Sequence, residues 1–347
     1  MILHRAEFFA ASNTESGFVS YFKENFRSRA DRCYIIKGGP GTGKSRLMQE
    51  LGAAAEDAGG AVEYYYCSSD PSSLDGLYVE LCGSSLSVID GTSPHGEDVI
   101  LAGAGDNLID LGRFWDQKQL YARRSDIVAL TKKKNDAYTS AYRSLAAYGA
   151  LTRAADALLE ECVDVGAMKE DALQIARSLP REEGIPSPNS AVGMRGRVSL
   201  DGIGCNAELE ILVADSRRYG ISYLYFDNLF QYLGTDCRYS PHPIMRGRCD
   251  GIRVGGVAVI EAKGTERGDN VIDVADFVDR EQYLAVQSRV LRLRTLADSA
   301  LECALDAFAN AGEAHMAVEK IYSSAMDFSA KEEYSASLCA KMSRGDL

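Results

Sequence analysis

The first ninety residues alternate short apolar runs with polar and glycine-rich breaks. Three runs of strand length are rich in β-branched and aromatic residues, which indicates buried strands at 33–37, 62–67 and 86–90. Two stretches have helical spacing instead: 15–26, where phenylalanines fall four apart, and 45–58, which ends at two glycines. This strand–helix–strand order with short connections predicts an α/β fold, a parallel sheet flanked by helices.

Beyond residue 115 the pattern becomes that of long helices. The stretch 116–179 lacks proline and is dominated by Ala, Leu and charged residues, which predicts two or three helices with a break near Gly149. The proline-containing stretch 180–188 predicts a linker. After it, strand-like runs occur at 198–200, 221–226 and 257–260, and 279–347 is again free of proline and helical in pattern.

The second half of the chain repeats part of the first. The string DNLID at 106–110 returns as DNVID at 269–273, an offset of 163 residues. The same offset continues for more than forty residues, pairing Phe114 with Phe277, Asp116 with Asp279, Gln119 with Gln282, Ser125 with Ser288 and Gly149 with Gly312. Two similar amphipathic helices would match only in pattern, and this string is not a helical pattern. The constant offset therefore predicts an internal duplication.

Composition narrows the class of protein. The chain has 347 residues, 46% of them hydrophobic and 25% charged, and a net charge of −12. The acidic excess argues against general binding of nucleic acids or anionic membranes, and the run Lys132–Lys134 is typical of a solvated helix face. No apolar run approaches the roughly 18 residues of a membrane span, and no signal peptide is visible. Nine scattered cysteines without a CxxC pair predict neither a disulfide framework nor a zinc site, so a cytoplasmic location is expected.

A glycine-rich octet between the first predicted strand and the next helix carries the strongest chemical signal. It fits the pattern G-x-x-x-x-G-K-[ST] in full, and with the following residue it gives the expected nucleotide contacts Gly38, Gly39, Pro40, Gly41, Thr42, Gly43, Lys44, Ser45 and Arg46. Glycines let backbone N–H groups turn inward to phosphate oxygens, and the helix adds its positive end. Lys44 would bridge β- and γ-phosphate oxygens, and the Ser45 hydroxyl would ligate Mg²⁺. ATP and Mg²⁺ are therefore the expected cofactors.

Asp90 ends an apolar strand, as the aspartate of a Walker B motif does. Its expected role is to hold Mg²⁺ through a water, opposite Ser45. The alternative is an aspartate that caps the turn at Gly91 and Thr92. Gly91 occupies the place where many P-loop ATPases carry a water-activating glutamate, so the sequence leaves the general base unassigned.

Two loop residues are further candidates for the catalytic centre. Asp70 follows the second predicted strand and would position a water or an acceptor hydroxyl; alternatively, Asp70-Pro71 only starts a turn. His95 follows the third strand and would contact the γ-phosphate; alternatively, it is a solvated loop histidine.

The second half shows no such octet. Its expected counterpart, 199–207, has two glycines but no lysine and no Ser or Thr at the required spacing, and Glu261 stands in the place of Asp90. We interpret this half as a degenerate P-loop domain; the alternative is an unrelated α/β segment. The acidic stretch 200–210 would repel phosphate, so one nucleotide per chain is expected. The string Met-Arg-Gly-Arg occurs twice, at 194–197 and 245–248, and could supply an arginine finger.

Three stretches together resemble a known family. They are the octet, YYCSSDPSSLDG at 65–76 and VIDGTSPH at 88–95, and they are similar to an uncharacterised bacterial family of tandem P-loop ATPases, some labelled nucleotide kinases. The likeness is specific over about residues 8–145. It implies two P-loop halves and supports roles for Asp70 and His95. This chain departs from the family pattern because its second half lacks the lysine and the Ser or Thr.

These observations predict a duplicated P-loop NTPase whose halves are each followed by a helical arm. The expected segments are a nucleotide-binding domain at 1–115, an arm at 116–180, a degenerate α/β domain at 181–278 and an arm at 279–347. The first half would bind Mg-ATP and hydrolyse it as a switch or motor, with Lys44, Asp70, Asp90 and His95 as catalytic candidates. The alternatives are a kinase for a small acceptor such as a nucleotide, or a non-catalytic ATP-dependent interaction module. The partner would be a protein or small molecule, and a homodimer is one option.

Overall fold

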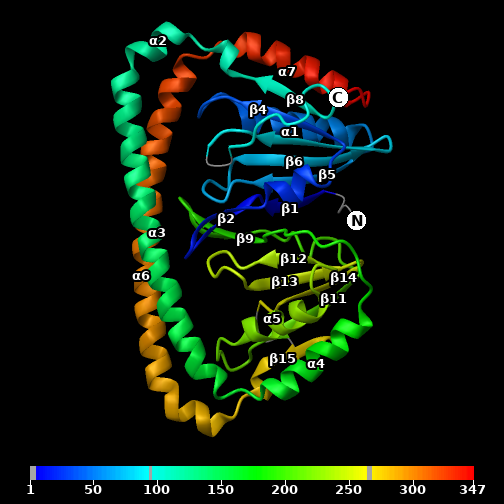
Figure 1. Ribbon diagram of the computed structural model, residues 1–347, viewed down its shortest axis with the longest axis vertical. Helices are drawn as coiled ribbons and strands as arrows, with labels where there is room; N and C mark the ends of the chain where they lie inside the picture. The colour runs from blue at the N-terminus through cyan, green and yellow to red at the C-terminus, as the bar shows by residue number, and fades with distance from the viewer. Residues whose placement is uncertain (1–4, 94–95, 264–267) are drawn as a thin grey trace.

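The computed structural model describes residues 5–93, 96–263 and 268–347 and has a mixed α/β fold (Figure 1). Two sheets lie one above the other, and two long helices run along one side of both. The cores lie on the faces of the sheets, where the buried side chains are mainly aliphatic and aromatic.

The first sheet has six strands, and all but one run in the same direction. In spatial order they are β1 (Ala6–Phe9), β5 (Ala61–Tyr66), β6 (Leu74–Leu81), β7 (Ser84–Asp90), β4 (Arg32–Lys37) and β8 (Asp106–Asp110). Only β6 is antiparallel to its neighbours. The three predicted strands are confirmed as β4, β5 and β7, and the predicted helix at 45–58 is α1 (Lys44–Asp57).

The second sheet has five strands in a matching arrangement. In spatial order they are β12 (Arg238–Pro241), β13 (Cys249–Val254), β14 (Val257–Glu261), β11 (Leu209–Ala214) and β15 (Val271–Asp273). Here β11 pairs in parallel with β14 and β15, as β4 does with β7 and β8, and only β13 is antiparallel to its neighbours. The predicted strand at 257–260 is confirmed as β14.

A short helix, α5 (Ser222–Leu233), lies where a strand at 221–226 was expected, so that prediction is wrong. Its apolar residues have helical spacing once the whole element is considered: Tyr225, Phe226 and Leu229 are all buried in the core of the second sheet. A short and mostly apolar run cannot by itself separate a buried helix from a strand.

Each half also contains a β-hairpin, the first directly after β1 and the second before β11. The first is β2 (Ala11–Thr14) with β3 (Gly17–Ser20), and the second is β9 (Ser190–Gly193) with β10 (Gly196–Ser199), which includes most of the run predicted at 198–200. The helix predicted at 15–26 is therefore wrong. Gly17 has φ of 110°, a turn conformation that starts β3, and only the π-helical segment Lys23–Arg27 is helical. Phe26 packs edge-on against Tyr65, so the aromatic spacing serves the core of the sheet rather than a regular helix.

The two long helices are α3 (Arg124–Glu160) and α6 (Arg280–Ser324), which pack along each other in opposite directions (Figure 1). The expected break near Gly149 is wrong, because α3 continues through it. A Cβ at Gly149 would lie 2.5 Å from Glu15 in the turn of the first hairpin, and one at Gly312 would lie 3.1 Å from Met194 in the turn of the second. These glycines permit close approach of the hairpins and do not end the helices. In the described ranges, no helix has an apolar stretch that could cross a membrane, although α3 has 37 residues and α6 has 45.

Each helical arm packs on the sheet of the other half. After α2 (Gln117–Ala122) and α3, helix α4 (Val165–Ser178) packs on α5, whereas α7 (Phe328–Met342) returns to α1 (Figure 1). The junctions match at the offset of 163. Asp116 N–H donates to Ala325 O at 2.7 Å, and Asp279 N–H donates to Cys162 O at 2.8 Å. Similarly, Asp327 N–H donates to Phe114 O, and Asp164 N–H donates to Phe277 O.

Candidate functional site

The glycine-rich octet lines a cavity of about 910 Å³. The cavity lies at the carboxyl ends of β4, β5 and β7 and is closed by α3 and α6. It brings the octet together with Asp70 and Asp90, which come from two separate loops. His95 lies outside the described residues. Arg46 does not line the cavity: its side chain lies on the exposed side of α1 and pairs with Glu50 at 2.9 Å and Glu332 at 3.6 Å.

The backbone of the octet depends on two of its glycines. Gly41 and Gly43 have φ of 70° and 80°, the left-handed region that other residues adopt with strain. A Cβ at Gly41 would also lie 2.7 Å from the carbonyl oxygen of Glu319, so the loop passes directly against α6. On its other side, α7 contributes the buried Lys331, whose Cε is 3.3 Å from the position of a Cβ on Gly43. Both helices of the second arm therefore fix this loop.

Lys44 folds back over its own loop. Its Nζ donates to Gly38 O at 3.1 Å and Gly39 O at 2.9 Å, and it lies 3.5 Å from Asp90 Oδ2. Only 11% of the Lys44 side chain is exposed, and only 12% of that of Asp90. This low exposure strengthens the attraction between the two charges, which holds Lys44 against its own loop.

Asp90 caps the turn, as its alternative interpretation predicts, and it also faces Lys44. Its Oδ1 accepts from Thr92 N–H at 2.8 Å and from the Thr92 hydroxyl at 2.6 Å, which is the turn cap. Its Oδ2 faces Lys44. Ser45 Oγ lies in the same cavity and accepts from Leu74 N–H at 2.9 Å. A side chain at position 91 would force its surroundings to shift, because a Cβ there would lie 2.4 Å from Ile35.

Asp70 starts a turn, as its alternative interpretation predicts, and it also lines the cavity. Its Oδ1 accepts from Ser72 N–H at 3.1 Å and from the Ser72 hydroxyl at 2.7 Å. The second hairpin reaches this turn: Arg195 pairs with Asp70 at 3.2 Å, and Met194 N–H donates to Ser69 O at 2.9 Å. One of the two Met-Arg-Gly-Arg strings thus meets the cavity edge through Arg195.

The sequence did not identify the cavity residues on the long helices. His315 and Glu319 of α6 face the cavity, with 3.9 Å between His315 Nε2 and Glu319 Oε1. Burial lowers the pKa of His315; Lys134 and Lys44 lower it further, whereas Glu319 and Asp70 act in the opposite direction. Lys134 lines the cavity and burial lowers its pKa, so the expectation of a solvated lysine run holds only for Lys132 and Lys133. The repeat indicated two related arms but gave no information on which helix faces meet.

The loop that follows β11 occupies the position in the second sheet that the octet occupies in the first. Arg218 and Gly220 have φ of 55° and 72°, and they stand four and six residues after the end of their strand, as Gly41 and Gly43 do. Ile221 and Ser222 then correspond to Lys44 and Ser45. The expectation that 199–207 is the counterpart is therefore wrong, because that stretch follows the hairpin strand β10 and precedes β11. Gly202 and Gly204 give that stretch its likeness to the octet, but they lie outside the loop that follows β11.

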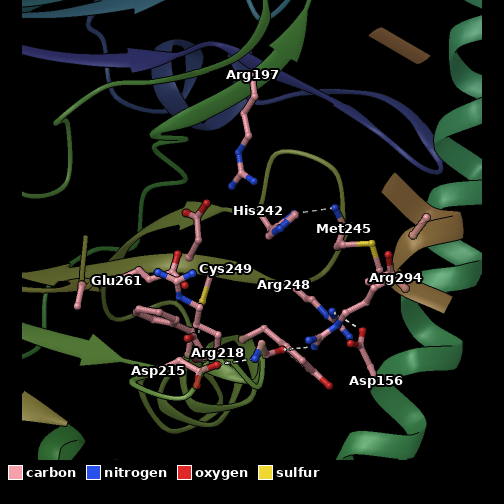
Figure 2. A pocket seen from close by; sticks show the side chains of 18 of the residues that line it. Asp156, Arg197, Asp215, Arg218, His242, Met245, Arg248, Cys249, Glu261 and Arg294 are labelled. Carbon is pink, nitrogen blue, oxygen red and sulfur yellow. Dashed lines mark hydrogen bonds and ion pairs between the residues drawn. The ribbon is translucent and has the colours of Figure 1, made fainter. Parts of the chain in front are cut away.

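A carboxylate of the chain itself fills this second loop. Asp215 lines a second cavity, where Figure 2 labels it. It accepts from Tyr219 N–H at 2.9 Å and also from the N–H groups of Gly220 and Ile221. Arg294 of α6 donates to Tyr219 O at 2.6 Å and Gly220 O at 3.2 Å. Asp215 thus occupies the inward-facing N–H groups that would hold a phosphate in a P-loop.

A scan against protein-family models and searches of curated proteins and of solved structures find no match to this chain.

Proposed function

We propose that the first half binds Mg-ATP at the loop Gly38–Ser45 and hydrolyses it. The observation that supports this most is the meeting of Lys44 and Asp90 at 3.5 Å beside a loop turned by Gly41 and Gly43. That combination provides inward-facing N–H groups and a cation for the phosphates, next to a carboxylate for a metal. The cavity of about 910 Å³ has room for a nucleotide.

The residues present fit Mg²⁺. Ser45 Oγ accepts one hydrogen bond and retains a lone pair, and Asp90 Oδ2 faces the cavity. Mg²⁺ is usually held in this way, by one or two protein oxygens together with substrate phosphates and water. When bound, it would supply positive charge against the phosphate oxygens.

For the general base we propose His315, oriented by Glu319. A neutral imidazole can take a proton from water, and the lowered pKa of His315 keeps it neutral at pH 7. Water would attack the γ-phosphorus, the bond to the β–γ bridging oxygen would break, and the water proton would pass to His315. Glu319, one helical turn further along α6, would stabilise the imidazolium. Many P-loop ATPases carry their glutamate base at the place of Gly91, where this chain leaves little room for a side chain. This crowding supports a base that comes from outside the first domain.

We further infer that the two halves are a duplicated P-loop domain whose second copy has lost its phosphate site. The matching strand order, the positive φ values after β4 and β11, and the arm junctions at the offset of 163 support the duplication. Ile221 stands in the second loop at the position that Lys44 holds in the first, and Asp215 fills that second loop. Both observations support the loss of the phosphate site. The second half then serves to complete the first site through α6, α7 and the hairpin β9–β10.

The test is the variant Lys44→Ala, assayed for ATP binding and for release of ADP and phosphate. Removal of the central cation should weaken binding or turnover at least tenfold, about 1.4 kcal/mol or more. Unchanged binding and turnover would contradict the site. The matched control is Lys133→Ala, an exposed lysine on α3, which should match the wild type.

The same assay separates hydrolysis from the alternatives. Phosphate release without an acceptor supports the ATPase. ADP production stimulated by a nucleoside or nucleotide supports a kinase, and tight binding without turnover supports an interaction module.

A further inference from the structure

Aromatic side chains line the first cavity in two groups, one on each side of the octet. Of the described residues that line this cavity, five are aromatic: Phe18, Tyr138, Tyr142, Tyr322 and Phe328. The octet follows β4, which lies between β7 and β8 in the sheet. The place of each group relative to these two strands determines which part of a nucleotide it can reach.

The first group lies on the β7 side of the octet. Tyr138 and Tyr142 have ring centres 6.3 Å apart, and the Tyr142 hydroxyl donates to Asn13 Oδ1 at 2.7 Å. Asn13 is paired with Phe18 in the first hairpin, which follows β1. In the sheet, β1 forms the edge beyond β5, β6 and β7. This group is therefore on the same side of the octet as Asp90, which ends β7.

The second group, Tyr322 and Phe328, lies on the β8 side. The ring centre of Tyr322 is 5.4 Å from that of Trp115, which stands five residues after the end of β8. Phe328 begins α7, and α7 packs on the turn that follows β8 (Figure 1). The residue before it, Asp327, donates its N–H to Phe114 O at 2.9 Å. The second arm thus places two aromatic rings on the side of the octet that faces away from β7.

Both rings are suited to contact a planar ligand. A Cβ on Gly39 would lie 3.1 Å from the ring of Tyr322 and 3.2 Å from that of Trp115, so these rings lie against the octet. Phe328 lines the cavity and is 41% exposed, although its side chain is apolar. An aromatic ring that is open to a cavity offers a stacking surface, and every nucleobase has a flat face that can use it.

The proposed Mg-ATP site sets the direction of the nucleotide. Lys44 lies 3.5 Å from Asp90, so the γ-phosphate and the metal would be on the β7 side of the octet. The ribose and the base then extend the other way, toward β8. We propose that the base stacks on Phe328 and packs against Tyr322, so that the second arm selects nucleotides over simple polyphosphates. This inference rests on the proposed nucleotide site and adds the residues that hold the base.

The test compares two ligands that share the phosphates but not the base. The full chain is titrated calorimetrically with Mg-ATP and with Mg-tripolyphosphate. Phe328→Ala and Tyr322→Leu should each raise the Kd for ATP at least tenfold, because base stacking is lost, and should change the Kd for tripolyphosphate less than about twofold. The matched control is Tyr121→Ala, an exposed aromatic residue of α2 that does not line the cavity, and it should bind both ligands as the wild type does.

Two outcomes would overturn the base site alone. One is an unchanged Kd for ATP in Phe328→Ala and Tyr322→Leu. The other is a selective loss of ATP binding in Tyr138→Ala, which would place the base in the first group of rings. In both cases Lys44→Ala would still weaken both ligands, so the phosphate site would stand. If neither ligand binds, or if Lys44→Ala leaves both unchanged, the proposed function fails and the base site fails with it.

Discussion

Two residues distinguish the two sheet-edge loops. Both loops have positive φ at the fourth and sixth residue after their strand. The first loop then presents Lys44, whereas the second has the buried Ile221 and an internal anion, Asp215. In the second loop an internal carboxylate satisfies the backbone N–H groups, which under the proposed function would bind phosphate in the first.

The proposed metal role of Asp90 can be tested by removing its single negative charge. In Asp90→Asn the side-chain oxygen can still accept from Thr92, so the turn should persist, but the charge that favours Mg²⁺ is removed. We expect ATP binding to depend less on Mg²⁺ and turnover to fall at least tenfold. ATP titrations with and without Mg²⁺ measure this.

Asp110→Asn is the matched control for Asp90→Asn. Asp110 also ends a strand, and its Oδ1 accepts from the N–H two residues later, that of Gly112, at 2.8 Å. This control should keep the Mg²⁺ dependence of the wild type. If Asp90→Asn does the same, Asp90 is a turn cap only.

At the level of elements, the sequence predicted best where local pattern and tertiary environment agree. The strands β4, β5 and β7 are buried apolar runs, and the octet between β4 and α1 has a backbone requirement that residue types reveal directly. The strand β6 was not predicted, since its apolar and polar residues do not form a short uninterrupted run. The helix expected at 15–26 failed because Gly17 and the docking of Phe26 on Tyr65 outweigh helical spacing.

The part of the candidate site that comes from distant elements could not be predicted. His315 and Lys134 lie on amphipathic helices whose sequence gives a polar face but not its neighbour. Only the antiparallel packing of α3 on α6 turns these polar positions toward the octet. Similarly, Gly149 was interpreted as a break because its true partner, Glu15, is more than a hundred residues away.

His315 of α6, the proposed general base, can be tested by substitution. In His315→Gln we expect kcat to fall about 100-fold or more, while the Kd for ATP changes little. The imidazole must be neutral to accept a proton, and burial lowers its pKa below 6.5. Wild-type kcat should therefore fall as the pH drops through that lowered pKa, and the fall should be absent from His315→Gln. Measuring kcat from pH 5 to pH 8, at about unit steps, tests this.

Glu313→Gln is the control on the same helix, because Glu313 is exposed and does not line the cavity. It should keep the wild-type rate and pH profile. A normal kcat in His315→Gln would exclude His315 and Glu319 from the mechanism without contradicting the proposed ATP binding.

For the whole molecule, the exchange of arms makes the two halves one folding unit. The walls of the first cavity come from β4, β5 and β7 of one half and from α6 and the second hairpin of the other. The second cavity is built in the same way, with α3 and α6 over β11 and β14. Neither half has a complete site alone, so experiments on nucleotide binding require the full chain.

The last prediction is that the full chain binds one ATP, at the first loop. The acidic stretch 200–210 gave this expectation from the sequence, but the relevant segment is the loop after β11. There the triphosphate, with about three to four negative charges, would have to displace the Asp215 carboxylate or bind beside it, and like charges about 4–8 Å apart cost roughly 0.5–1 kcal/mol per pair even in water. Ile221 supplies no compensating cation, and Arg294 is held by loop carbonyls. Calorimetric titration should therefore give a stoichiometry near one. A value near two would place nucleotide in the second loop and contradict its degeneracy.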